Sequence, residues 1–154
     1  MDFVPKTMPP DLLLSVISVM TGGPMKCLII NCHGIANEQK EGGFGLDIGQ
    51  GIGLKETKYF AFIKGLFKCI VLPNCQVARV TNVGKEGDGR LLCSQIARAS
   101  GAHVVAPIKR QRRPTDLPEF CMDKFEGLVQ RFNPSGDLER SSLLGIKLIR
   151  DVAK

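Results

Sequence analysis

The chain alternates between short apolar runs of strand length and stretches whose apolar residues recur at helical spacing. Three apolar runs predict strands at residues 26–31, 68–72 and 102–107. Continuous apolar runs of this length are typical of strands buried on both faces, as in a parallel sheet. Helical spacing at residues 55–65 and 90–100, before the second and third runs, predicts helices that connect parallel strands by crossovers.

The remaining segments predict elements around this core. Asp11 is a suitable N-cap for an apolar helix over residues 12–20, which follows an irregular arm. Residues 44–53 alternate apolar with small or polar residues, which indicates a short hairpin or extended flap beside the edge at His33. The glycines of this segment do not form a dinucleotide-binding pattern and indicate turns and close backbone approach. Residues 125–132 and those from 137 onward predict a β-hairpin, and residues 141–153 predict a short helix.

These elements together predict an α/β fold with a mostly parallel sheet flanked by helices and a C-terminal β-hairpin. The length of 154 residues fits a single domain over residues 1–154. Within it we expect an N-terminal arm and helix at 1–24, a core at 25–107, and a basic loop, hairpin and helix at 108–154.

The net charge of +6 comes from lysines and arginines spread along the chain, with a single cluster at residues 109–113. A solvated loop is the more common role of such a cluster than a nucleic-acid patch. The chain has no Trp and a single Tyr, so stacking platforms for single-stranded nucleic acid are scarce. We therefore expect no nucleic-acid partner, although a basic binder of nucleic acid or anionic surfaces stays open as a weaker alternative.

The apolar run at residues 12–20 is too short to span a membrane and lacks the basic flank of a signal peptide. We therefore expect no membrane span. We expect the protein to be synthesised in the cytoplasm, and any export would use a route that needs no signal peptide.

Several of the six cysteines lie inside apolar runs, where a free Cys behaves as a small hydrophobic residue. This placement indicates a reducing compartment rather than a disulfide framework. No CxxC pair is present, so we expect no metal site and no cofactor.

Two reactive residue types follow the first two predicted strands. His33 comes just after the first strand and Cys75 just after the second. Because the carboxyl ends of parallel strands meet at one edge of a sheet, we expect both side chains at that edge. A thiolate at Cys75, proton transfer by His33, and backbone N–H donors at Gly34 and Cys75 would supply a cysteine nucleophile, its base and an oxyanion hole.

Each residue also has a structural interpretation. Cys75 alone is as readily a buried structural thiol, and His33 alone is more commonly a loop histidine held by hydrogen bonds. We interpret His103, inside the third strand, as a hydrogen-bonded sheet residue. Cys32 is expected to point to the face opposite His33 and to be structural.

The order of these segments resembles the caspase-like cysteine peptidases of clan CD, which include gingipains, clostripain, separase and CHAT domains. The resemblance is stronger to the small caspase-like domains of bacterial proteins. An apolar strand precedes His33-Gly34, and a second precedes the block Asn74-Cys75-Gln76-Val77-Ala78. A Gly-rich turn, a helix and the strand segment GAHVVAP complete the pattern at residues 87–107.

This resemblance implies a three-layer α/β/α sandwich and a cysteine endopeptidase acting on protein or peptide substrates without a cofactor. Cys75 would attack the scissile carbonyl, His33 would transfer a proton to the leaving amine, and Gly34 with Cys75 would form the oxyanion hole. A role as a bacterial effector follows from the same resemblance. Candidate substrate-binding residues are Asn74, Asp88, Lys109 and Arg110. A catalytically inactive caspase-like binding module stays open as the main alternative, and the oligomeric state is left open.

Overall fold

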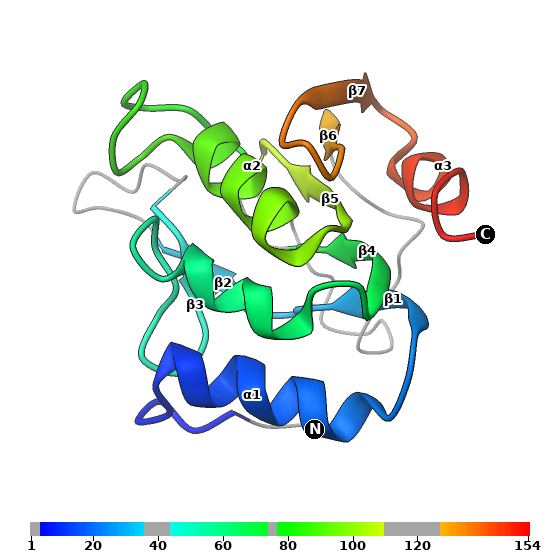
Figure 1. Ribbon diagram of the computed structural model, residues 1–154. Coiled ribbons are helices and arrows are strands. Elements are labelled where there is room, and N and C mark those ends of the chain that lie inside the picture. The colour runs from blue at the N-terminus through cyan, green and yellow to red at the C-terminus, as the bar shows by residue number, and fades with distance from the viewer. Residues whose placement is uncertain (1–3, 36–43, 74–76, 110–126) are drawn as a thin grey trace, which may run out of the picture.

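A mixed five-stranded sheet forms the centre of the computed structural model, which describes residues 4–35, 44–73, 77–109 and 127–154 (Figure 1). The strands lie in the order β1-β4-β5-β6-β7. Their bounds are β1 Met25–Ile29, β4 Phe67–Val71, β5 His103–Pro107, β6 Val129–Phe132 and β7 Leu138–Ser142. The pairs β1–β4 and β4–β5 are parallel, whereas β5–β6 and β6–β7 are antiparallel. The predicted α/β class is confirmed, and its parallel part consists of the three strands nearest the N-terminus.

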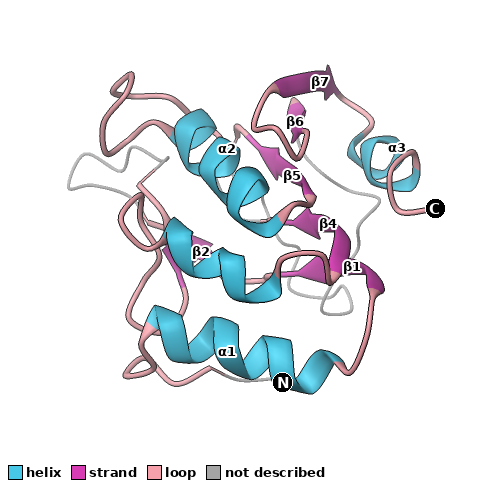
Figure 2. Cartoon of the chain, in the orientation of Figure 1, coloured by secondary structure: helices cyan, strands magenta, loops and turns pink. Residues whose placement is uncertain are grey.

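The described ranges contain four helical segments, which pack around this sheet (Figure 2). They are α1 Pro10–Thr21, the 3-10 helix η1 Thr57–Ile63, α2 Gly89–Ser100 and α3 Gly145–Arg150. In Figure 1, α1 and α2 lie on the same side of the sheet with η1 between them, and η1 contacts both. Helix α3 contacts β5, β6 and β7 near the C-terminus.

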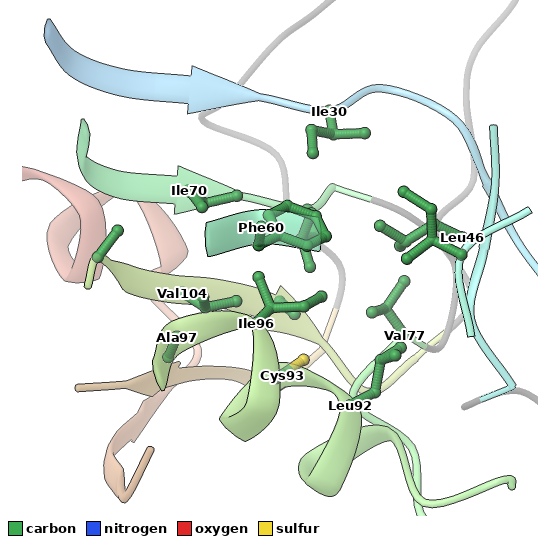
Figure 3. Packing of buried hydrophobic residues seen from close by; sticks show 14 of the residues in the cluster. Ile30, Leu46, Phe60, Ile70, Val77, Leu92, Cys93, Ile96, Ala97 and Val104 are labelled. Carbon is green, nitrogen blue, oxygen red and sulfur yellow. The ribbon is translucent and has the colours of Figure 1, made fainter. Parts of the chain in front are cut away.

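Side chains from the two faces of the sheet form two hydrophobic clusters. The larger cluster joins the sheet to α1, η1 and α2, and its members include Phe60, Ile70, Ile96 and Val104 (Figure 3). The smaller cluster lies against α3 and consists of Cys69, Val71, Val105, Val129, Leu148 and Ile149. Because successive strand residues point to opposite faces, β4 contributes Ile70 to the larger cluster and its two neighbours to the smaller one.

The first strand is more exposed than its apolar sequence predicts. β1 lies at the end of the strand order, with β4 as its neighbour. Met25 and Ile29 are 52% and 40% exposed, respectively. Helix α3 lies against strands at the other end of the sheet. The apolar run therefore marked a strand correctly but did not reveal that one of its faces would be left partly uncovered.

Three helices of the structure differ from the predicted helices in their ends or in their type. Helix α1 begins at Pro10, whose fixed φ suits the first turn, so Asp11 lies inside that turn and the predicted Asp11 cap is wrong. Residues 57–63 form a 3-10 helix with i to i+3 bonds at its end, such as Lys64 N–H to the Ala61 carbonyl. The predicted helix at 141–153 shortens to α3, because its first residues complete β7, where Ser141 pairs with Gln130.

None of the helices in the described ranges is both long enough and apolar enough to cross a membrane.

Candidate functional site

His33 lies on the protein surface just beyond the carboxyl end of β1. After β1 the chain passes through buried Ile30 and then forms the short strand β2, His33–Gly34. β2 pairs antiparallel with β3, Leu46–Asp47, so that His33 lies opposite Asp47 and Gly34 opposite Leu46. The flap predicted at residues 44–53 therefore does lie beside His33.

Burial of alternate residues fixes the direction of the His33 side chain. Cys32 packs against the larger hydrophobic cluster, and Leu46 is fully buried in it (Figure 3). His33 and Asp47, one residue further along each strand, are both exposed. The packing of Cys32 agrees with its interpretation as a structural residue. The His33 side chain lies outside the hydrophobic core.

The flap that supports β2 is closed by backbone hydrogen bonds. The N–H groups of Leu46 and Ile52 donate to each other's carbonyl oxygens, both at 2.9 Å. Gly45 has a φ of 141°, and a Cβ at that position would collide with the Ile52 carbonyl. The glycines of this segment therefore serve the turns and close approach expected from the sequence.

The N-terminal arm holds the other side of the flap. The backbone N–H of Gln50 donates to the Met8 carbonyl at 2.9 Å, and its side-chain amide donates to the Thr7 carbonyl at 3.2 Å. Lys6 forms an ion pair with Asp47, with Nζ 3.5 Å from Oδ2. Sequence reasoning treated this arm as irregular and missed its contact with the flap, because no local pattern reports a pairing between segments some forty residues apart.

The second predicted strand end lies next to the first. Ile29 pairs with Val71, and the N–H of Ile30 donates to the Val71 carbonyl at 3.0 Å, so the chain leaves β1 and β4 at the same edge. Leu72 and Pro73 are buried as β4 ends. Asn74 and the candidate nucleophile Cys75 come next in the sequence but lie outside the described residues, so their positions stay predictions.

Of the two basic candidates that follow β5, Lys109 is exposed on the loop after that strand. Arg110 lies outside the described residues.

Asp88 is a helix cap with both carboxylate oxygens engaged. Its Oδ1 accepts the N–H of Leu91 at 2.9 Å, and its Oδ2 accepts the N–H of Gly84 at 2.8 Å. The residue is 7% exposed. The predicted cap of α2 is confirmed, and these contacts favour that role over selection of a basic substrate side chain, so the proposed site omits Asp88.

His103 is the first residue of β5 and lies at the end of that strand opposite to the carboxyl edge. Its Nε2 is 3.5 Å from Oε2 of Glu139 on β7. This placement agrees with a sheet residue held by a polar contact rather than a member of the His33 site.

Three of the described thiols have environments that disfavour the thiolate. Burial, with a smaller contribution from the nearby Cys27 thiol, raises the pKa of Cys69 to about 12. Burial also raises the pKa values of Cys27 and Cys93. Cys27 and Cys69 lie opposite each other on β1 and β4 as free thiols. Within the described ranges, no group of three or more His, Cys, Asp or Glu side chains is placed to hold a metal ion.

Comparisons of the chain with protein-family models, with curated proteins and with solved structures find no match.

Proposed function

We propose that this chain is a cysteine endopeptidase of caspase-like architecture that uses Cys75 as nucleophile and His33 for proton transfer. The observation that supports it best is the shared edge of β1 and β4, with exposed His33 four residues after the end of the first of these strands and half-buried Gly34 next to it. Cys75 follows the second strand by four residues. In open α/β sheets, binding and catalytic sites form just beyond the carboxyl ends of adjacent parallel strands.

The finer architecture belongs to the same proposal. The layer of α1, η1 and α2, the central sheet, and α3 on the other face correspond to a three-layer sandwich. The antiparallel pairing of β6 with β7 supports a C-terminal hairpin in that architecture. The whole chain, residues 1–154, is one such domain in this proposal.

The chemistry requires few groups. The Cys75 thiol gives its proton to His33, which becomes an imidazolium, and its sulfur forms a bond to the scissile carbonyl carbon. The carbon–oxygen π electrons move to the oxygen, and the backbone N–H groups of Gly34 and Cys75 stabilise the resulting oxyanion. When the carbon–nitrogen bond breaks, the His33 imidazolium gives its proton to the leaving amine. Water, deprotonated by His33, then cleaves the thioester and releases the acid and the free thiol. Each step balances without a metal or cofactor.

Substrate recognition is the least constrained part of the proposal. We assign the substrate as a protein or peptide, with Asn74, Lys109 and Arg110 as the candidate binding residues, which follow β4 and β5 by two or three residues in the sequence. A cationic loop at Lys109 and Arg110 favours acidic side chains near the cleaved bond. In the bacterial context of the resemblance, the enzyme is made in the cytoplasm and acts as an effector.

The test is site-resolved labelling of the native protein with iodoacetamide at about pH 6, where an ordinary thiol is almost wholly protonated. The raised pKa values of Cys27, Cys69 and Cys93 keep the background from these core thiols low. We expect fast labelling confined to Cys75, altered in His33→Ala and unchanged in His103→Ala, the matched control. Slow or indiscriminate labelling in all three proteins contradicts the peptidase and favours a caspase-like binding module without turnover.

A further inference from the structure

The residue opposite His33 has no role in the dyad described above. We propose that Asp47 is a positioning residue for His33: its carboxylate accepts the N–H of one imidazole nitrogen and so fixes the tautomer and the ring orientation. The effect of this orientation on the reactivity of Cys75 rests on the proposed function. The position of Asp47 opposite His33 in the β2–β3 register does not depend on it.

The strand register brings the two side chains to the same face of the flap. In an antiparallel pair, residues directly opposite each other have Cβ atoms about 4.5–5.5 Å apart and side chains on one face. His33 and Asp47 form such a pair. Their neighbours Gly34 and Leu46 form the other pair, and Leu46 is fully buried. Because Leu46 anchors β3 in the core, Asp47 must project outward, on the side where His33 is exposed.

The backbone that carries Asp47 is held on both sides. The reciprocal hydrogen bonds between Leu46 and Ile52 close the turn that follows Asp47. The bond from Gln50 N–H to the Met8 carbonyl fixes the turn against the N-terminal arm. A carboxylate on a fixed backbone can orient a partner at low entropic cost, which is the requirement for a positioning residue.

The ion pair with Lys6 does not remove Asp47 from this role. Lys6 is 82% exposed and Asp47 is 41% exposed, and the atoms are 3.5 Å apart. Exposed pairs of this kind contribute little and exchange readily with water. A carboxylate has two oxygens and can accept from Lys6 and from an imidazole N–H together.

The chemical reason for such a partner is the asymmetry of the neutral imidazole. One ring nitrogen carries a proton and donates, and the other has a lone pair and accepts. A base for Cys75 must direct its lone pair to the thiol, so the other nitrogen must keep the proton. A carboxylate only accepts, so Asp47 selects the tautomer in which the nitrogen facing it is protonated.

The direct test is nitrogen-15 NMR of the imidazole in the full-length protein, at a pH where the His33 signals no longer change with pH. We expect one dominant tautomer of His33 in the native protein. Asp47→Ala should reduce the ratio of the two tautomers by about two- to fivefold, because one net hydrogen bond sets the upper end and solvent exposure of the pair lowers it. Asp47→Asn should keep part of the preference, because the amide oxygen still accepts. His103, held by Glu139, serves as the internal reference that does not change.

Two further variants separate the explanations. Lys6→Gln removes the ion pair but leaves the carboxylate, so the tautomer ratio should stay the same or increase. A tautomer ratio that does not change in Asp47→Ala, with the fold intact by circular dichroism, overturns the role of Asp47.

The labelling rate of Cys75 then tests the link to the proposed function. If His33 activates Cys75, Asp47→Ala should alter the rate in the same direction as His33→Ala, by a smaller factor. If His33→Ala leaves the rate unchanged while Asp47→Ala changes the tautomer ratio, the peptidase proposal fails and the positioning of His33 by Asp47 is retained. If His33→Ala changes the rate and Asp47→Ala changes neither the rate nor the tautomer ratio, the peptidase is retained and the inference fails.

Discussion

Arg131 and Glu139 form an ion pair across an irregularity in the β6–β7 ladder, with Nε of Arg131 2.8 Å from Oε2 of Glu139. Arg131 pairs with Arg140 and Phe132 pairs with Leu138, so Glu139 is an additional residue of β7, as in a β-bulge. Nη1 of Arg131 also donates to the Leu148 carbonyl of α3 at 3.0 Å. One buried guanidinium therefore joins β6, β7 and α3.

Removal of this guanidinium should destabilise the C-terminal part of the chain. Arg131→Ala leaves the Leu148 carbonyl and the Glu139 carboxylate without this donor, and we expect a loss of about 2–4 kcal/mol in the free energy of unfolding. Arg140→Ala is the matched control, because Arg140 is 60% exposed and its pair with Asp151 spans 3.8 Å. The control should change stability by no more than about 0.5 kcal/mol in urea denaturation. Equal effects of the two variants would show that Arg131 is not a structural tie.

Asp88 should contribute to stability as the cap of α2. We expect Asp88→Ala to cost about 1–2 kcal/mol, since the N–H groups of Leu91 and Gly84 lose their acceptor. Asp11→Ala should have a much smaller effect, because Asp11 lies within the first turn of a helix that has no side-chain cap. Thermal and urea unfolding of both variants measure the difference. A smaller loss in Asp88→Ala than in Asp11→Ala would contradict the assignment.

The buried thiols should make the fold sensitive to alkali. The pKa of Cys69 is raised by burial from 9.0 to about 12, so between these values the unfolded chain releases a proton that the folded chain keeps. The contribution of this thiol to the free energy of unfolding is therefore complete below the pKa of Cys69 in the unfolded chain. It is lost as the pH rises toward the pKa of Cys69 in the folded chain, by up to about 1.4 kcal/mol per pH unit.

This pH dependence can be assigned by mutation. Cys69→Ala should be less stable than the native chain at neutral pH, because it leaves a cavity among Val71, Val105 and Leu148. Its stability should nevertheless fall less steeply with pH above about 9, the range in which the unfolded thiol ionises. Parallel slopes for the native chain and Cys69→Ala in urea titrations would exclude Cys69 as the source.

Gln130 should be replaceable by an apolar residue of similar size. It is 1% exposed on β6, and its Oε1 has no hydrogen-bond partner among the residues that the structure describes. A buried acceptor without a donor loses its hydration without compensation. We expect Gln130→Met to leave the free energy of unfolding unchanged or to raise it by up to about 1 kcal/mol in urea denaturation. A loss of stability would indicate a hydrogen bond to Gln130 in solution.

The main strands and α2 could be predicted from the sequence because their signals are local. The apolar run before Pro73 and the run HVVAP mark β4 and β5 to within a residue or two. Asp88 and Gly101 mark the two ends of α2, since a side-chain acceptor and a residue with positive φ are local requirements. The position of His33 after a strand and beside a flap could be predicted from the same kind of pattern.

The contacts between distant segments could not be predicted in this way. The N-terminal arm gave no sign that Met8 would accept a hydrogen bond from Gln50, or that Lys6 would reach Asp47. The bulge at Glu139 depends on how β7 fits against β6, and sequence reasoning placed a helix over part of that strand.

The sequence by itself determined the alternation of strands and helices, the cap of α2 and the position of His33 after a strand. These features depend on periodicity and on side-chain acceptors within a few residues of the backbone they serve. Only the tertiary structure decided that Asp47 lies opposite His33, that β1 is partly exposed at one end of the sheet, and that Arg131 ties α3 to the sheet. Each of these depends on which segments pair in space. That choice is made by the burial of the whole core, which no short stretch of sequence contains.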